Sequence, residues 1–221
     1  AMVPVAGRPL IEICLHHLIE QGASEVVVNV HHFAQQIIDY VNSHEWPIPI
    51  RISNESEELL NTGGGLRKAG ELFTADGQPI LIHNVDILSN APIKDFYQNH
   101  LSHDATLLVS ERNTQRYLLF DDDMRLRGWT NIATGEVRSP FANIEPEKLH
   151  RYAFSGIHMF SPRLFTRMQS YPKVFPIMDF YLNECAKADI RGCVQPNLQL
   201  MDVGKLNTLH EAEHFVNELG L

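Results

Sequence analysis

A short apolar stretch that ends in polar side chains constrains the fold of this chain most. Ile80, Leu81 and Ile82 form a strand that is apolar on both faces, and such a strand belongs inside an α/β sheet, beneath helices. The stretch then turns polar at Asn84 and Asp86. Because open α/β sheets bind ligands at the carboxyl ends of their strands, Asp86 is a candidate metal ligand or catalytic group. The alternative interpretation is that Asp86 only begins a turn.

The segments around this strand alternate between helix and strand patterns. Apolar residues at helical spacing follow Leu10, and a second amphipathic pattern covers 33–41, whereas 25–30 and 48–53 have the pattern of strands. This alternation predicts an α/β fold with a mostly parallel sheet and right-handed crossovers. The chain has 221 residues, of which 44% are hydrophobic, so we expect one domain that covers residues 1–221.

Charge and composition argue against several classes of partner. The net charge of −9 and the lack of a basic stretch indicate that nucleic acid is not a partner. No apolar run reaches the length of a membrane span, so we expect no membrane partner. The three cysteines show no CxxC spacing, and such an odd, sparse set without a signal peptide indicates a reducing, cytoplasmic location.

Three consecutive glycines need a physical explanation. Thr62, Gly63, Gly64 and Gly65 precede the apolar residues of a helix that we expect to begin at Leu66. Because glycine loses more conformational entropy on folding than any other residue, a run of three predicts backbone that approaches something closely. A helix N-terminus suits a nucleotide base or phosphate, and the alternative is a flexible surface loop. The run is neither GxGxxG nor GxxxxGK[ST], so neither a dinucleotide fingerprint nor a P-loop is supported.

A second apolar strand, expected at 198–201, ends at Asp202 and repeats the arrangement at Asp86. Two carboxylates can hold Mg²⁺ through oxygen ligands and leave positions open for phosphate oxygens. Together with the glycine segment, this pair indicates nucleotidyl transfer. We expect the two carboxylates to lie close together despite their separation in sequence.

Two other motifs allow more than one interpretation. The aspartates at 121–123 resemble a DxD metal motif, but they fall at the expected tip of a hairpin, where aspartate favours turns. Ser155 and Gly156 interrupt a strand expected at 152–160, and a glycine inside a strand indicates a bulge or a closely approaching ligand. The polar segment 131–148 is expected to pass over the active-site face.

Several segments resemble, in order and spacing, motifs of the sugar-1-phosphate nucleotidylyltransferases. The similarity is nearest to the N-acetylmuramate 1-phosphate uridylyltransferase and the mannose- or heptose-1-phosphate subgroups. The matching segments are Pro4-Val5-Ala6-Gly7-Arg8-Pro9-Leu10-Ile11, Thr62-Gly63-Gly64-Gly65-Leu66, Asn84-Val85-Asp86, Phe154-Ser155-Gly156-Ile157, Phe175-Pro176 and Asp202-Val203-Gly204.

This resemblance implies a fold, a reaction and a set of site residues. The fold is a single-domain, three-layer sandwich around a mostly parallel mixed sheet, the Rossmann-like nucleotide-diphospho-sugar transferase fold. The reaction joins a sugar 1-phosphate to a nucleoside triphosphate and releases pyrophosphate. The implied roles are Mg²⁺ binding and catalysis for Asp86 and Asp202, nucleotide binding for Thr62, Gly63, Gly64, Gly65 and Asn84, and sugar-phosphate binding for Ser155 and Gly156.

One departure from the family pattern leaves rival hypotheses open. The family begins with a strand and a loop whose arginine and lysine offset the triphosphate charge, and Ala1 stands where the residue after that lysine would be. We therefore expect a preceding strand and loop in the native protein. The rivals are a non-catalytic domain that binds nucleotide or sugar phosphate and a metal-dependent glycosyltransferase that uses a DxD motif. The sequence does not indicate the base, the sugar or the oligomeric state.

Overall fold

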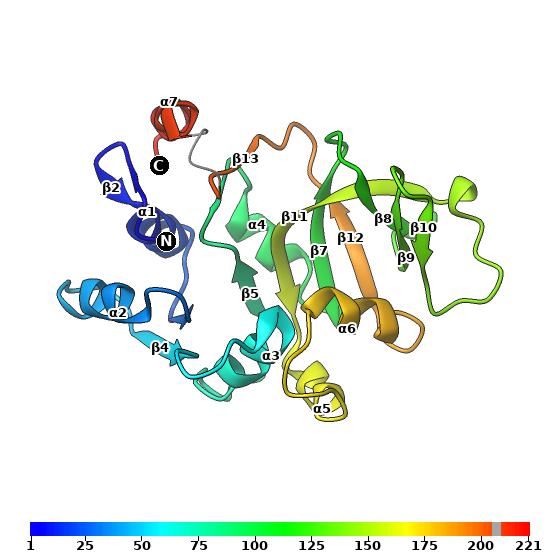
Figure 1. The fold of residues 1–221 in the computed structure, drawn as a ribbon, viewed down its shortest axis with the longest axis horizontal. Coiled ribbons are helices and arrows are strands. Elements are labelled where there is room, and N and C mark those ends of the chain that lie inside the picture. The colour runs from blue at the N-terminus through cyan, green and yellow to red at the C-terminus, as the bar shows by residue number, and fades with distance from the viewer. Residues whose placement is uncertain (205–208) are drawn as a thin grey trace.

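The computed structural model describes residues 1–204 and 209–221, and its centre is a seven-stranded mixed sheet (Figure 1). Six strands follow the order β10-β9-β8-β11-β7-β12, and β5 pairs with β11 beside them. The strands are β5 (Ile80–His83), β7 (Ala105–Ser110), β8 (Arg116–Phe120), β9 (Leu126–Asn131), β10 (Glu136–Arg138), β11 (His150–Phe160) and β12 (Ile190–Val194).

Strand direction in this sheet confirms the mixed α/β class and refines the expected topology. β7 and β12 are parallel, while β11 runs antiparallel to β5, β7 and β8. β5, β7 and β12 therefore share one direction, as βα crossovers require. The hairpin strands β8, β9 and β10 are antiparallel, so antiparallel pairs outnumber parallel ones, and the expectation of a mostly parallel sheet is wrong at the level of hydrogen-bonded pairs.

In the described ranges 1–204 and 209–221, three two-stranded pairs lie outside the central sheet. β3 and β4 are parallel, whereas β1 with β2 and β6 with β13 are antiparallel. Their bounds are β1 (Pro4–Val5), β2 (Arg8–Pro9), β3 (Val26–Val30), β4 (Ile50–Asn54), β6 (Ile87–Ser89) and β13 (Leu200–Asp202).

Seven α-helices and two short 3-10 helices are present in the described parts of the chain. The helices are α1 (Leu10–Glu20), α2 (Ala34–Asn42), α3 (Asn61–Gly70), α4 (Ile93–Asn99), α5 (Phe165–Met168), α6 (Ile177–Glu184) and α7 (Leu209–Leu219), with 3-10 turns at Pro146–Lys148 and Pro162–Leu164. None of the described helices combines the length and the apolar character needed to cross a bilayer.

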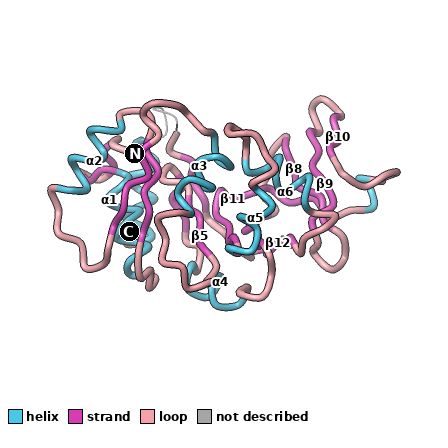
Figure 2. Tube along the Cα trace, turned by 90° about the horizontal axis from the view of Figure 1, so that it is seen from below, coloured by secondary structure: helices cyan, strands magenta, loops and turns pink. Residues whose placement is uncertain are grey.

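Alternate side chains of β7 show why the molecule has three layers. Leu107 and Val109 pack in one apolar cluster with Phe180 of α6, whereas Leu108 packs in another with Phe96 of α4. Successive strand residues point to opposite faces, so α6 and α4 cover opposite faces of the sheet (Figure 2). Burying one such side chain contributes about 1.5–3 kcal/mol of transfer free energy, which makes the alternation a strong determinant of the register.

The β3–β4 pair lies beside the central sheet, but no described strand pairs with both of them. Within the described residues, β3 pairs only with β4, and β5 pairs only with β11, so each has one edge without a strand partner. Val85, which follows β5, packs in the same apolar cluster as Val28 and Val30 of β3. Figure 1 shows the pair to one side of the main sheet.

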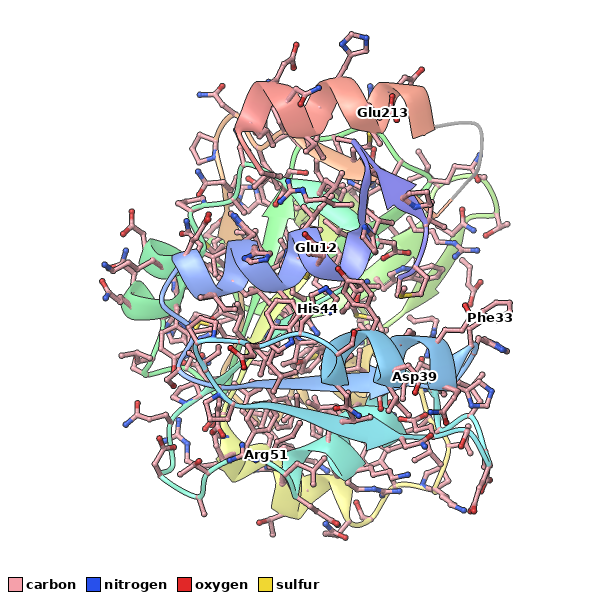
Figure 3. All side chains as sticks on the ribbon, turned by 90° about the vertical axis from the view of Figure 1, so that its left-hand side faces the viewer. Glu12, Phe33, Asp39, His44, Arg51 and Glu213 are labelled. Atoms are coloured by element: carbon pink, nitrogen blue, oxygen red, sulfur yellow. The ribbon has the colours of Figure 1, made fainter. Side chains whose placement is uncertain are left out.

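The helices on the outer side of β3 and β4 stack on one another. Figure 3 shows α7, α1 and α2 in succession, with α2 nearest the β3–β4 pair. The Tyr40 hydroxyl of α2 donates to the Glu12 carboxylate of α1, and Arg51 pairs with Glu25 at the start of the two strands. Phe33 projects from the edge of this stack and is 75% exposed.

Candidate active site

Asp86 and Asp202 lie close together, as the sequence predicts. Asp86 occupies the turn between β5 and β6, and antiparallel pairing of β6 with β13 places Asp202 opposite Ile87. The Val203 amide donates to the Asp86 carbonyl oxygen at 2.8 Å. A Cβ atom built on Gly204 would lie 2.9 Å from Asp202 Oδ1 and 3.4 Å from Asp86 Oδ2, so both carboxylates reach the same point in space.

The pairing that unites these carboxylates lies outside the main sheet. It is the separate antiparallel pair of β6 and β13, in which Asp202 ends one strand and Asp86 precedes the other. Within the described residues, neither Asp86 nor Asp202 makes an ion pair with a basic side chain. Two unpaired carboxylates facing one point repel each other, and a hard cation with oxygen ligands relieves that repulsion.

The groups beneath Asp86 are neutral at pH 7. The Cys14 sulfur lies 3.8 Å from His83 Nδ1. Burial, reinforced by the nearby charge of Asp86, raises the pKa of Cys14 to about 12, and burial lowers the pKa of His83 to about 4. The thiol therefore stays protonated and the imidazole stays neutral, so neither side chain offsets the charge of the carboxylates.

The described part of the chain contains no cluster of three or more His, Cys, Asp or Glu side chains arranged to hold a metal. Asp86 and Asp202 alone would leave most positions around a divalent ion to water or substrate oxygens. Mg²⁺ usually keeps several waters and is bound by one or two carboxylates plus substrate phosphates. The two residues therefore fit Mg²⁺ held jointly with phosphate.

Gly156 forms a bulge in β11 that brings the Asn84 turn close. The register of β11 against β7 shifts between Phe154 and His158, and Gly156 has φ +83°. The Asn84 amide donates to the Gly156 carbonyl oxygen at 3.2 Å, and a Cβ on Gly156 would lie 2.9 Å from Asn84 Nδ2. This confirms the predicted bulge, and the close neighbour of Gly156 is the turn that carries Asp86.

Ser155 has a structural position rather than an open one. Its side chain is 1% exposed. The hydroxyl donates to the Leu108 carbonyl oxygen at 2.7 Å and accepts from the Ile157 amide at 3.2 Å. Direct contact with a sugar, as the resemblance implied for Ser155, is therefore not available in this structure, because the hydroxyl is used to close the bulge.

The glycines lie inside helix α3 rather than before it, so the predicted start at Leu66 is wrong. α3 begins at Asn61, and Gly63, Gly64 and Gly65 are all buried. The amides of Gly63 and Gly64 both donate to the Phe175 carbonyl oxygen, at 2.8 and 3.2 Å. A Cβ on Gly63 would lie 2.4 Å from the Phe175 ring. The expected close approach is therefore real, and for Gly63 its partner is another part of the chain.

Gly64 and Thr62 contact the same segment. A Cβ on Gly64 would lie 2.4 Å from the Lys173 carbonyl oxygen, and the Thr62 hydroxyl accepts the Ile177 amide at 2.9 Å, at the start of α6. Gly64 therefore faces no open cleft, since the backbone of 173–175 covers it. Gly65 instead faces the side chains of Glu55 and Asn29.

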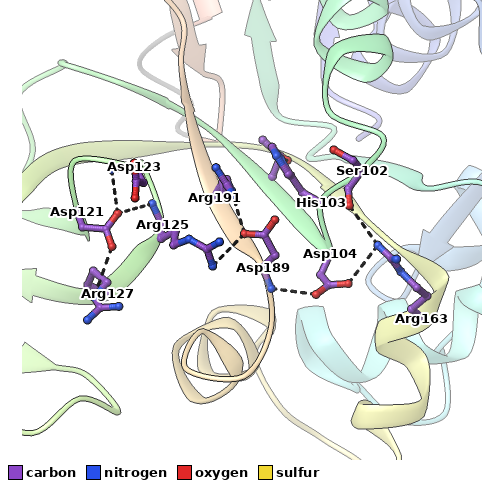
Figure 4. A network of polar contacts seen from close by, with 11 residues as sticks. Ser102, His103, Asp104, Asp121, Asp123, Arg125, Arg127, Arg163, Asp189 and Arg191 are labelled. Carbon is purple, nitrogen blue, oxygen red and sulfur yellow. Dashed lines mark hydrogen bonds and ion pairs between the residues drawn. The ribbon is translucent and has the colours of Figure 1, made fainter.

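The aspartates at 121–123 belong to a polar network on the hairpin of β8 and β9. Asp121 Oδ1 accepts the amides of Asp123 and Arg125, at 3.2 and 2.9 Å, and Arg125 pairs with Asp189 (Figure 4). Asp122 is almost fully exposed and contacts His150 at 3.0 Å. This confirms the predicted turn and removes the support for a DxD glycosyltransferase.

An open hollow beside the carboxyl end of β7 was not anticipated from the sequence. Its volume is about 440 Å³, and it lies where β7, β8, β9 and β11 meet. Glu111 follows the last residue of β7, and that position at a strand end is the signal that could have identified it. The lining residues are Glu111, Tyr117, Ile132, His150, Arg151 and Tyr152.

Comparison with known proteins decides the family. The model of a family described as nucleotidyl transferase matches residues 1–218. The chain belongs to this nucleotidyl transferase family. The sugar-1-phosphate resemblance seen in the sequence is thus confirmed at the level of the family.

Curated proteins that match the chain include mannose-1-phosphate guanylyltransferases. Mannose-1-phosphate guanyltransferase beta-B of Xenopus laevis is 25% identical over 190 residues, which cover 77% of this chain and 50% of that protein. The mannose-1-phosphate guanylyltransferase catalytic subunit beta of Dictyostelium discoideum is 25% identical over 231 residues, covering 100% and 57%. The chain thus spans about half the length of the curated relatives it matches.

Solved structures of similar fold match nearly the whole chain. HddC from Yersinia pseudotuberculosis, solved with and without GMP-PN, has a TM-score of 0.73 in both cases and covers 96% of this chain and 88% of its own. The inositol-1-phosphate CTP transferase from T. maritima has a TM-score of 0.75 and covers 99% and 86%. At 10–20% identity, these neighbours establish the fold alone.

Proposed function

We propose that this member of the nucleotidyl transferase family joins a sugar 1-phosphate to a nucleoside triphosphate. An oxygen of the sugar phosphate attacks the α-phosphorus of the nucleoside triphosphate. The bond between the α-phosphorus and the oxygen that bridges it to the β-phosphorus breaks. The products are pyrophosphate and a nucleoside diphosphate sugar. One observation carries the proposal: Asp86 and Asp202, from segments far apart in sequence, face the same point without a basic partner among the described side chains.

Asp86 and Asp202 would hold Mg²⁺, which offsets phosphate charge when it is bound. The remaining work of the protein is positioning and electrostatics, because phosphoryl chemistry requires little covalent participation from side chains. The bulge at Gly156 fixes the turn of Asn84 and Asp86 against β11, and Ser155 holds that bulge closed. Gly156 and Ser155 would therefore act by holding the Asp86 turn in a fixed position against the sheet.

The two substrates would lie on either side of the carboxylates. The base would approach the start of α3, where Gly65 packs closely against the side chains of Glu55 and Asn29. The sugar would extend toward the hollow at Glu111, Tyr117 and Arg151, which lies farther along β11. Side chains with hydroxyl, carboxylate and guanidinium groups suit a polyhydroxylated ring.

The names of the relatives suggest the first substrates to test. Because the curated relatives are mannose-1-phosphate guanylyltransferases, GTP with mannose 1-phosphate is the first pair, and UTP, CTP and dTTP are the comparisons. Thermal shift measures this directly, because a ligand that binds only the native state raises the melting temperature. At 100 times its dissociation constant, the preferred nucleotide with Mg²⁺ should raise it by about 5–10 °C.

Substitution of the carboxylates tests the site. In Asp86→Asn and Asp202→Asn, we expect the Mg²⁺-dependent part of the nucleotide shift to disappear and pyrophosphate release to fall by about 10²-fold or more. Melting temperature without ligand should stay level or rise, because each substitution removes one member of a repulsive pair. Asp122→Asn, on the exposed hairpin tip, is the matched control and should behave as the unsubstituted protein.

Two results would contradict the proposal. A large loss of stability without ligand in Asp86→Asn would assign that residue a structural role. Nucleotide binding without pyrophosphate release at any substrate concentration, in a chain that also carries the family's phosphate-binding loop, would instead identify a non-catalytic binding domain.

A further inference from the structure

Asp86 lies inside a tight turn that a single carbonyl group closes. The Ile87 amide donates to the Asn84 carbonyl oxygen at 3.1 Å, so residues 84–87 form a β-turn with Asp86 at its third position. The Asn84 amide in turn donates to the Gly156 carbonyl oxygen of β11 at 3.2 Å. The orientation of the Asn84 carbonyl group therefore helps to set the direction in which Asp86 projects.

The same carbonyl oxygen has a second contact, from a side chain. Nδ1 of His83, the last residue of β5, lies 2.8 Å from the Asn84 carbonyl oxygen. Because a carbonyl group can only accept, Nδ1 carries the hydrogen and donates it. The His83 ring thus adds a side-chain donor to the backbone donor of Ile87, and the two donors together fix the carbonyl group that closes the turn.

Helix α1 confines the ring of His83. The Cys14 sulfur lies 3.8 Å from Nδ1, and Cys14 and His17, three residues apart on one face of α1, line a small cavity together with His83. The free volume of this cavity is about 10 Å³, close to the space that one water molecule needs. The ring therefore has no room to adopt another rotamer on the side of α1.

The two carboxylates of the site differ in how they are held. The Asp202 carboxylate accepts the Gly204 amide at 2.9 Å, so a hydrogen bond of its own fixes its direction. Among the described residues, no hydrogen bond and no ion pair reaches the carboxylate of Asp86. The direction of Asp86 therefore depends on the backbone of its turn.

We propose that His83 is a positioning residue, which aims the Asp86 carboxylate at the Mg²⁺ position by fixing the Asn84 carbonyl group. The inference rests on the proposed function and extends the metal site to a side chain that touches neither the metal nor the phosphates. Groups that orient a metal-binding carboxylate typically change metal affinity or activity ~10–100-fold when they are removed.

Electron paramagnetic resonance of Mn²⁺, a paramagnetic substitute for Mg²⁺, tests the inference by measuring binding of the metal alone. His83→Ala removes the donor and should weaken Mn²⁺ binding about 10-fold. In a parallel calorimetric titration with GTP, saturating Mg²⁺ should return the nucleotide affinity of His83→Ala to that of the unsubstituted protein, because the metal itself then holds Asp86. A role in folding alone would not be rescued by Mg²⁺.

Two conservative substitutions distinguish the donor from the bulk of the ring. In His83→Asn the side-chain amide takes the place of Nδ1 and can still donate to the Asn84 carbonyl oxygen, so most of the Mn²⁺ affinity should be restored. In His83→Gln the amide takes the place of Nε2, and the affinity should stay low. The melting temperature of each variant without metal serves as the check on folding.

A matched control comes from a histidine with the same kind of contact after α2. Nδ1 of His44, an exposed residue, donates to the Tyr40 carbonyl oxygen at 2.7 Å, and His44→Ala should leave Mn²⁺ binding unchanged. Equal Mn²⁺ affinity for His83→Ala and the unsubstituted protein would overturn the inference. Equal weakening in His83→Asn and His83→Gln would also overturn it, because the ring would then act by packing and not by donating.

The same measurements separate the inference from the proposed function. If Asp86→Asn abolishes Mn²⁺ binding and His83→Ala leaves it unchanged, only the inference fails. If the unsubstituted protein binds no Mn²⁺ even with nucleotide present, the proposed metal site fails, and the inference fails with it.

Discussion

At the scale of single residues, His158 couples stability to pH. It is 3% exposed within the sheet, and its Nδ1 lies 2.7 Å from the Tyr181 hydroxyl. Burial lowers the pKa of His158 from 6.5 to about 3, so below pH 6.5 the unfolded chain binds a proton that the native state does not. The free energy of unfolding should therefore have its full value above pH 6.5. As the pH is lowered from 6.5 to 3, it should decrease by up to about 1.4 kcal/mol per pH unit.

Urea denaturation at pH 7.5, 6 and 5 measures this slope. His158→Gln keeps a polar partner for Tyr181 and removes the titrating ring, so its stability should decline less steeply below pH 6.5. Part of the slope should remain, because burial also lowers the pKa of His83, to about 4. Equal slopes for the two proteins would show that His158 is protonated in the native state.

At the scale of elements, Arg67 fastens α3 to the segment that covers its glycines. Its guanidinium donates to the carbonyl oxygens of Met168, Tyr171, Pro172 and Lys173, at 2.8 to 3.3 Å. Its charged carbon also lies 5.3 Å from the centre of the Phe175 ring. One side chain thus fixes the covering loop while the glycines allow its backbone to approach.

Removing this contact should loosen the start of α3. Arg67→Ala leaves four carbonyl oxygens without their donor, and we expect a loss of about 2–3 kcal/mol, seen as a melting temperature roughly 4–12 °C lower. Nucleotide affinity should fall as well, because the base would approach this start of α3. Arg116→Ala, at an exposed position of β8, is the matched control. An unchanged melting temperature for Arg67→Ala would show that the glycine packing suffices alone.

At the scale of the whole molecule, the two free edges of β3 and β5 fit an additional strand. Each edge lacks a strand partner among the described residues, and unpaired backbone groups are costly when buried. A strand placed between them would pair with both edges, and the family resemblance implies that such a strand would carry a phosphate-binding loop beside Asp86. Its arginine and lysine would act as a preorganised clamp on the triphosphate.

A chain extended by that strand and loop should melt at a higher temperature and release pyrophosphate much faster than the 221-residue chain. Loss of even one preorganised donor costs about 10²–10³ in rate, so the shorter chain should turn over slowly. Substituting the loop lysine in the extended chain controls for the added strand alone. Equal turnover by the short and extended chains would mean that other cations serve the phosphates.

The sequence alone determined the local features of the site. A two-sided apolar strand ending in Asn84 and Asp86, a second strand ending at Asp202, and a glycine bulge at Gly156 can each be predicted from spacing and residue type, because strand period and turn chemistry are local properties. The family resemblance followed from the same short segments. The hairpin tip at 121–123 was predicted correctly for the same reason.

Only the tertiary structure decided what these features contact. The glycines at 63–65 indicated a close approach, but the approaching groups, Phe175, Lys173 and Glu55, come from other segments of the chain. The antiparallel pairing that unites Asp86 with Asp202 and the contact of Cys14 with His83 are likewise invisible in the sequence. Partners distant along the chain are selected by the packing of the whole molecule, so no local pattern can encode them.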